Sequence, residues 1–449
     1  MKHFFSKYAS YYRQNLRLAL PVIVSQVGQI SVTVVDTIMV GRLSHVGLAA
    51  IGFANSISMP AILLGLGLSM GLTPLVGKSL ARKDFNRTTS LLKNSLALNM
   101  MYVAVLIALL LALPGIMDYM GQDAEILPTA RSYYYWITAS ALPAMLFFTG
   151  RQFLEGLGNT HYAMIITIIS NLVNVLLNFC FIYGLWFFPE MGAVGAGTAT
   201  FIARVLQFLL FATLILNREQ YSRYLKNMRN VKLCKFRLRR LLNIGIPISI
   251  QVFIEIFVFS IMAIAIGTFG AKALAAHQIA NNVASMAYMV VIGFQAAATI
   301  LVSQYNGARL WEQMRMTMRA SLHIIIIFEL FTAICIALFS RDIASLFTTE
   351  ATVITIASNF LLLGALFQIS DGIQGVSLGG LRGILIVKSP MYITILGYII
   401  ISLPVAWICS YPLGMDEYGT WVGFIVALTI FAVTFTRLFF KKISKLQRQ

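Results

Sequence analysis

The sequence predicts an all-α protein that crosses the membrane many times, and three observations lead to that prediction. The 449 residues are 59% hydrophobic and 11% charged, with a mean hydropathy of +0.81. Apolar runs long enough to cross about 30 Å of hydrocarbon as helices recur along the whole chain. Runs such as LIALLLALPG lack the alternation of apolar and polar residues that a transmembrane β-barrel requires.

Twelve such runs are the predicted transmembrane helices. In chain order they cover residues 16–41, 47–76, 91–115, 131–153, 162–187, 192–216, 241–267, 274–302, 318–340, 353–378, 388–412 and 420–440.

The basic residues predict how the chain is oriented. Lysine and arginine outnumber aspartate and glutamate by 34 to 16, which gives a formal charge of +18. They gather at both ends of the chain and in every second connection between spans, whereas the intervening connections hold acids. The positive-inside rule therefore predicts two cytoplasmic termini. Because topology explains the charge, we expect no nucleic-acid partner.

The chain resembles itself at a shift of 226 residues, where ten positions are identical. This predicts two parallel six-helix lobes related by a pseudo-two-fold axis along the membrane normal. The identical pairs include Pro21 with Pro247, Thr73 with Thr299, and Val76 with Val302.

A weaker match at a shift of 227 pairs Gly156 with Gly383, so we expect the repeat to extend through each lobe. The predicted division is an N-terminal lobe at 1–216, a basic and solvated cytoplasmic linker at 217–240, and a C-terminal lobe with its tail at 241–449. Two facing repeats are the usual construction of a secondary transporter, and no ATP-binding loop occurs.

Four acidic residues lie inside these apolar stretches: Asp36, Glu255, Glu329 and Asp371. A charge at mid-bilayer costs at least ~2.5–3.5 kcal/mol, so such residues normally face a protein interior, a watery cavity or a bound cation. Their placement indicates ion handling within the membrane.

In the first lobe, Asp36 lies in the outer half of its span, ~30 Å along the helix. Asn174 and Asn178 share one helix face, and Thr200 lies at a similar depth. These oxygens suit Na⁺ or a protonatable aspartate, and Asp36, Asn174 and Asn178 are the predicted Na⁺ ligands. The alternative interpretation of the amides and the hydroxyl is polar contact between helices.

In the second lobe, Glu255 and Asp371 lie at depths of ~21 and ~27 Å along their spans, which does not by itself bring them together. If they share a cavity, one of the two carboxyl groups would be protonated and could exchange its proton for Na⁺. Gln278 and Asn282 lie four residues apart on one helix face and could line the same cation and substrate cavity.

Glu329 fits this interpretation least well. It lies midway along the ninth span in IIIIFELFT, whose other residues indicate a lipid-facing helix. We therefore expect Glu329 to be protonated and hydrogen-bonded to a neighbouring helix, and assign it no coupling role. His277, near the outer end of the eighth span, is expected to face water.

The chain resembles the multidrug and toxic compound extrusion (MATE) family, in its bacterial NorM-like branch. The resemblance covers nearly the whole chain and depends on these segments: LPVIVSQVGQISVTVVDTIMVGRLS, GLGNT, NVLLNFCFIYG, GAVGAGTAT, IGIPISIQVFIEIFVF and QISDGIQGV.

The resemblance implies a twelve-helix antiporter of the bacterial inner membrane that exports cationic amphipathic compounds in exchange for Na⁺ or H⁺. It implies a first-lobe cation site at Asp36, Asn174, Asn178 and Thr200, and matches the NorM-like acids to Glu255 and Asp371. One departure is Phe367, which stands where similar proteins have a tyrosine that contributes to cation binding. Glu329 has no counterpart in the family pattern.

We therefore expect a multidrug efflux antiporter that works as a monomer in the lipid bilayer, with small organic cations as substrates. The alternative is a flippase for lipid-linked precursors, which would need a basic cavity for phosphates. An intramembrane enzyme is not expected, because no nucleophile–base or paired-histidine pattern is present. The four cysteines have no paired spacing, and we expect no permanently bound cofactor.

Overall fold

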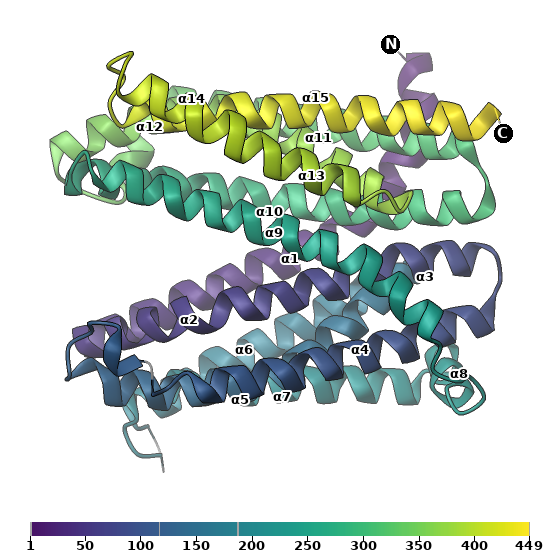
Figure 1. The fold of residues 1–449 in the computed structure, drawn as a ribbon, viewed down its shortest axis with the longest axis horizontal. Coiled ribbons are helices and arrows are strands. Elements are labelled where there is room, and N and C mark those ends of the chain that lie inside the picture. Colours follow the sequence, from purple (N-terminus) through teal and green to yellow (C-terminus); the bar gives the residue numbers. More distant parts are fainter. Residues whose placement is uncertain (1, 116, 186–187, 449) are drawn as a thin grey trace. The chain divides into compact units, whose positions relative to one another are not determined.

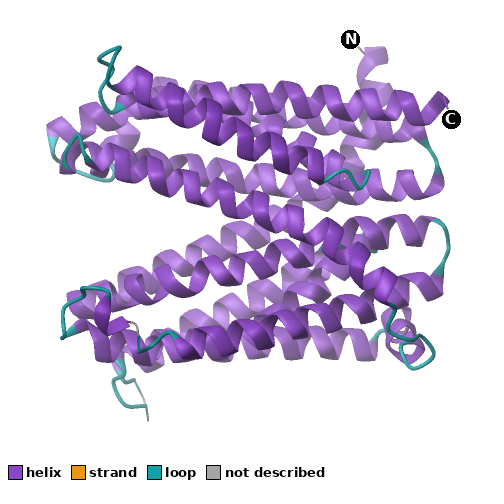
Figure 2. Ribbon diagram, in the orientation of Figure 1, coloured by secondary structure: helices purple, strands orange, loops and turns teal. Residues whose placement is uncertain are grey.

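The structure is a computed structural model that describes residues 2–115, 117–185 and 188–448. Every regular element in this part of the chain is a helix (Figure 2). The predicted all-α fold is confirmed. The last two residues of the predicted fifth span lie outside the described residues.

The helices follow the predicted spans closely (Figure 1). Their bounds are α1 Lys2–Leu43, α2 His45–Met70, α3 Leu72–Ala81, α4 Phe85–Ala112, the 3-10 turn η1 Met117–Tyr119, α5 Ile126–Gly156, α6 His161–Tyr183, α7 Gly192–Asn217, α8 Glu219–Asn227, α9 Lys235–Gly267, α10 Ala271–Ala308, α11 Trp311–Ser345, α12 Ala351–Gly383, α13 Lys388–Leu396, the π-helix η2 Gly397–Ser402, α14 Leu403–Ser410 and α15 Tyr418–Arg448.

Eleven helical stretches of the described chain are long and apolar enough to cross a membrane. The predicted span that is not among these eleven is the fourth, at 131–153; it lies in α5, which carries Arg131, Arg151 and Glu155. Its 31 residues give it membrane-spanning length, and it packs against α2, α4 and α7. The chain is therefore a multi-pass helical membrane protein.

Local sequence sets several helix ends. The hydroxyl of Ser44 accepts a hydrogen bond from the Gly47 amide at 3.0 Å and caps α2. The carboxylate of Asp84 caps α4 through the Arg87 amide at 2.9 Å. Gly184 ends α6 in the left-handed conformation, with φ of 66°. Short polar connections thus separate long apolar helices.

The described chain divides into two compact units whose edges differ from the predicted lobes. The first unit holds Val24–Ser249, and the second holds Met1–Ile23 with Ile250–Gln449. The N-terminal half of α1 belongs to the second unit because Asn15 bonds to α11: its Oδ1 atom accepts from the Ser321 hydroxyl at 2.6 Å. The start of α9 belongs to the first unit, where Ser249 donates to the Leu64 carbonyl at 2.8 Å.

The internal repeat reappears as equivalent contacts, one set within each unit. Thr73 donates its hydroxyl to the Gln152 carbonyl at 2.9 Å, and Thr299 donates to the Gly379 carbonyl at 3.0 Å. The two threonines are 226 residues apart, and the two acceptors are 227 apart. The shifts found in the sequence therefore correspond to shared packing.

Glycines allow the close approach of helices at these points. A side chain on Gly156 would meet Val76, and one on Gly383 would meet Val302. Both pairs are related by the same repeat. Small residues at such contacts are the usual means of packing helices in a membrane.

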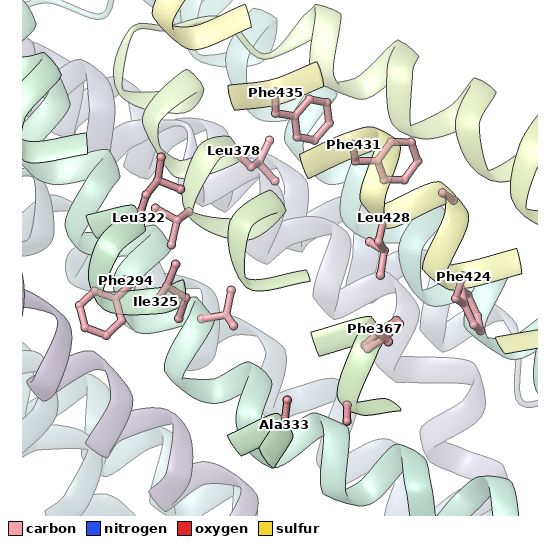
Figure 3. Close-up of a cluster of buried hydrophobic side chains, with 14 of the residues drawn as sticks. Phe294, Leu322, Ile325, Ala333, Phe367, Leu378, Phe424, Leu428, Phe431 and Phe435 are labelled. Atoms are coloured by element: carbon pink, nitrogen blue, oxygen red, sulfur yellow. The ribbon is translucent and has the colours of Figure 1, made fainter. Parts of the chain in front are cut away.

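The core of the second unit lies around α12, which packs against α10, α11 and α15. Figure 3 shows Ile325 and Ala333 of α11 in this cluster, with aromatic rings from α15 beyond them. Phe424, Phe431 and Phe435 are all at most 1% exposed. These apolar side chains fix the helices that carry the acidic residues described below.

The predicted water-facing position of His277 is wrong. This side chain is 2% exposed, and its Nδ1 atom accepts a hydrogen bond from Trp421 Nε1 at 3.1 Å. The imidazole therefore joins α10 to α15. The sequence held no direct sign of the indole partner, which is 144 residues away.

Replacing Trp421 by phenylalanine should destabilise the protein by roughly 1–3 kcal/mol, because a buried acceptor on His277 then lacks its donor. Thermal unfolding in detergent would measure the loss. Trp407→Phe is the matched control, since that indole is 60% exposed. Equal unfolding temperatures for the two variants would contradict the prediction.

The predicted linker at 217–240 is attached to α4 at several points. Lys93 of α4 donates to the Met228 and Val231 carbonyls at 2.9 and 2.8 Å, and Asn94 accepts from the Cys234 amide at 3.0 Å. Tyr224 of α8 is 3% exposed. The segment is therefore attached to α4, because its carbonyls and tyrosine offered contacts that a count of basic residues overlooks.

Candidate cation sites

The first candidate site lies within the first unit, between α1 and α6. Asp36, half-buried on α1, accepts a hydrogen bond at Oδ1 from the Asn178 side-chain amide. The same Asn178 amide nitrogen donates to Asn174 Oδ1 at 3.2 Å. Asn174 and Asn178 are 4% and 0% exposed. The structure thus brings together three of the four residues predicted for this lobe.

One oxygen in this group has no partner. Asn178 Oδ1 is buried and accepts no hydrogen bond among the described residues. A buried acceptor without a donor is costly, which makes such an atom a candidate cation ligand. Rotation of the Asn178 side-chain amide would place its oxygen, instead of its nitrogen, beside Asp36.

Thr200 does not join the group through hydrogen bonds. It is half-buried on α7, and no hydrogen bond in the described chain connects it to Asp36 or the asparagines. Its place as a ligand stays a prediction.

Two residues near this site were not predicted. Tyr133 of α5 is 6% exposed, donates to Asn55 Oδ1 at 3.4 Å, and lies within electrostatic range of Asp36. Arg204 of α7 donates to the Ser140 hydroxyl at 2.6 Å and lies within electrostatic range of Tyr133. The signal in the sequence was Arg204 itself, a cation inside an apolar span.

The second candidate site lies within the second unit. Asp371 of α12 lies within electrostatic range of Glu255 on α9 and of Glu329 on α11. Glu255 lies beside Gln251 and Gln374. Its Oε1 atom is buried and accepts no hydrogen bond of normal geometry among the described residues. Three of the four intramembrane acids therefore lie in the same region of the second unit.

The cluster also contains residues that the sequence did not indicate. Arg382, 4% exposed on α12, is an electrostatic partner of Glu255. Tyr288 of α10 and Tyr398 of η2 lie within electrostatic range of both Glu255 and Asp371.

Tyr398 is positioned by an irregular helix. It belongs to the π-helix between α13 and α14, which runs beside α15 (Figure 1). A π-bulge inserts an extra residue into a turn and is frequent at functional sites. Hydropathy alone does not distinguish this bulge from a regular span.

Gln278 and Asn282 are exposed on one face of α10, and no hydrogen bond joins either to the acids in the described chain. Their role in a substrate path stays a prediction.

Phe367 is 4% exposed and packs against Phe259 and Trp421, at ring distances of 6.2 and 5.7 Å. This position is thus part of the apolar core.

The lipid-facing character predicted for the context of Glu329 holds for Ile327, Leu330 and Phe331, which are exposed, but not for Glu329 itself. Glu329 is 1% exposed and lies on the core face of α11, between Ile325 and Ala333. The neighbouring isoleucines did not reveal which face of α11 is buried, because they are apolar whether they face lipid or the core of the unit.

No group of three or more His, Cys, Asp or Glu side chains in the described chain is arranged to hold a metal ion. A Na⁺ ion at Asp36 would therefore depend on neutral amide oxygens as well as the carboxylate, and those are present. Oxygen ligands of this kind suit hard cations and are also compatible with a proton.

Buried carboxylates inside two repeated bundles of membrane helices define the class of protein as a polytopic membrane protein with charged groups placed for ion handling. The family model MatE matches residues 21–180 and 247–408, so the chain belongs to the MatE family. The predicted family is confirmed.

Relatives and solved structures agree. The chain is 32% identical to "Multidrug resistance protein MdtK" of Photorhabdus laumondii, over 99% of this chain and 97% of that protein. It is 32% identical to "Multidrug resistance protein NorM" of Photobacterium profundum, over 94% and 93%. A structure described as the outward-facing conformation of a multidrug resistance MATE family transporter has the same fold, with a TM-score of 0.90, 22% identity, and coverage of 98% and 97%.

Proposed function

We propose that this chain is a multidrug antiporter that exports cationic amphipathic compounds in exchange for Na⁺ or H⁺. The observation that carries the proposal is Asp36, a carboxylate in an apolar helix bundle that is held by the buried amide of Asn178. The names of the relatives MdtK and NorM support export of drugs. The proposed location is the bacterial inner membrane, with both termini in the cytoplasm.

In this proposal a cation replaces the Asn178 amide group as the partner of Asp36. The unpartnered Asn178 Oδ1 then turns towards the cation, and Asn174 supplies a second neutral oxygen. Binding neutralises Asp36 and removes a buried acceptor without a donor. Coupling requires that this binding differ in strength between the inward and outward states, because equal affinity shifts no equilibrium.

The flippase alternative is not favoured. Two of the buried arginines lie beside acids: Arg151 Nε pairs with Glu155 Oε1 at 2.8 Å, and Arg382 lies near Glu255, whereas Arg204 donates to the Ser140 hydroxyl. Arg151 and Arg382 therefore do not form the continuous basic cavity that lipid-linked phosphates would need. The proposed protein acts as a monomer on small organic cations and needs no permanently bound cofactor.

Dye efflux from proteoliposomes tests the proposal. We expect a fluorescent cationic dye to leave the vesicles when a Na⁺ gradient is imposed, with a pH gradient applied in a separate experiment. Vesicles without protein are the control. Efflux driven only by the pH gradient would make H⁺ the coupling ion, and no efflux under either gradient would contradict the antiporter.

A further inference from the structure

The linker that precedes α9 is held in one position against α4, within the first unit. Lys93 of α4 donates to the carbonyls of Met228 and Val231 at 2.9 and 2.8 Å. Asn227, the last residue of α8, donates to Asn86 Oδ1 at 2.9 Å. The ammonium group of Lys93 thus serves to hold the linker, and the remaining cations of the linker lie on a surface of fixed shape.

This surface is strongly basic. The linker carries nine lysines and arginines and a single acid, Glu219. The turn between α3 and α4, with the first turn of α4, adds Arg82, Lys83 and Arg87. The one acid of this turn, Asp84, accepts from the Arg87 backbone amide and caps α4. In the described chain, none of these cations forms an ion pair with an acid.

Arginines from three elements meet on this surface. Arg223 of α8 lies 5.5 Å from the centre of the Phe85 ring, at the first residue of α4. Arg240 of α9 lies within electrostatic range of Arg82 and Arg87. Arg87 and Arg240 are half-buried, so water screens their mutual repulsion less than it would at an open surface. An anion bound between these arginines would replace repulsion by attraction.

Exposed apolar side chains adjoin the arginines. Leu233 and Phe236 are 59% and 70% exposed. Phe236 lies four residues before Arg240, so the two share one face of α9. The neighbouring Lys232 and Lys235 are exposed as well. Apolar and basic side chains that are exposed together are typical of segments that lie in the headgroup region of a membrane.

We propose that Arg82, Arg87 and Arg240 bind the phosphate of an anionic phospholipid in the leaflet beside the linker. Guanidinium groups suit this ligand because they donate paired hydrogen bonds to phosphate oxygens. The acyl chains of the same lipid contact Phe236 and Leu233. A free phosphate would make no use of these apolar side chains, and this favours a lipid as the source of the anion. The inference goes beyond the proposed function, since it does not depend on which compound or ion is transported.

Native mass spectrometry of the purified full-length protein in detergent tests the inference. Phosphatidylglycerol should bind more tightly than phosphatidylcholine with the same acyl chains, because only phosphatidylglycerol has a net negative charge. Arg240→Gln should weaken phosphatidylglycerol binding roughly fivefold to tenfold, since one of three cations at the phosphate is lost. Arg87→Gln should have a similar effect, and it replaces Arg240→Gln in the test if that variant fails to fold.

Arg229→Gln is the matched control. Arg229 is exposed in the same linker, and its replacement removes the same charge. We expect this variant to bind phosphatidylglycerol within about twofold of the wild type, because a diffuse surface charge contributes little in salt. Phe236→Ser keeps every cation and should still weaken phosphatidylglycerol binding, because the acyl chains lose an apolar contact.

Equal loss of affinity in Arg240→Gln and Arg229→Gln would overturn the site, because it would show that only the total charge of the linker matters. Equal binding of phosphatidylglycerol and phosphatidylcholine would overturn it too. Inorganic phosphate is the probe for the other source of the anion. Phosphatidylglycerol should raise the unfolding temperature of the protein, and an equal rise with inorganic phosphate at the same concentration would overturn the assignment to a lipid.

Discussion

Asp36→Asn is expected to reduce dye efflux to the level of vesicles without protein, while the variant still inserts and folds. The amide has almost the same shape as the carboxylate but carries no charge for a cation to neutralise. The contact between residue 36 and Asn178 then has the same strength whether or not a cation is present. Cation binding therefore no longer shifts the balance between the inward and outward states, and transport is not coupled. Efflux in proteoliposomes with the imposed gradient measures the effect.

Asp118→Asn is the matched control for this result. Asp118 lies in η1 of the same unit, is 49% exposed and pairs with Arg131 at the surface. Surface ion pairs contribute only ~0–1 kcal/mol, so normal efflux is expected. Normal efflux by Asp36→Asn itself would refute the assignment of the first cation site.

Gly379→Ala is expected to destabilise the second unit by about 1–3 kcal/mol, through overpacking at the contact of α12 with α10. The added methyl group would meet the backbone carbonyl of Gln295, which no side-chain rotation can move away. The same backbone region provides the Gly379 carbonyl that accepts from Thr299. A lower unfolding temperature and a lower yield of monodisperse protein should follow.

Gly52→Ala makes the same chemical change in α2, where no heavy atom beyond the adjoining backbone of α2 and the two neighbouring residues lies within 4 Å of the added methyl group. Alanine favours a helix over glycine by about 1 kcal/mol, so this variant should be as stable as the wild type or more stable. If Gly379→Ala behaved like Gly52→Ala, the close approach of α10 and α12 would not be a constraint on the fold.

Much of the fold could be predicted because membrane helices depend on length and hydropathy, which are local properties. The repeat was visible because the pairs Thr73 with Thr299 and Gly156 with Gly383 occupy equivalent contacts. The π-helix was not predictable, since its apolar residues would equally well form a regular α-helix.

The sites were only partly predictable, for a related reason. An acid in an apolar run is visible by itself, which is how Asp36, Glu255 and Asp371 were found. Which face of a helix is buried depends on partners far away in the chain. The burial of Glu329 within the unit was therefore not evident from its apolar context, and the cation Arg382 that lies near Glu255 was overlooked.

The two halves of the chain share helix contacts but not the positions of their acidic residues. The hydrogen bonds of Thr73 and Thr299 are equivalent, yet the position equivalent to Asp36 is Met262, and the one equivalent to Glu255 is Gln29. The halves thus share a scaffold but hold different charges in different places. A chimera built from two copies of either half would keep the duplicated packing and lose one kind of site, so neither half can substitute for the other.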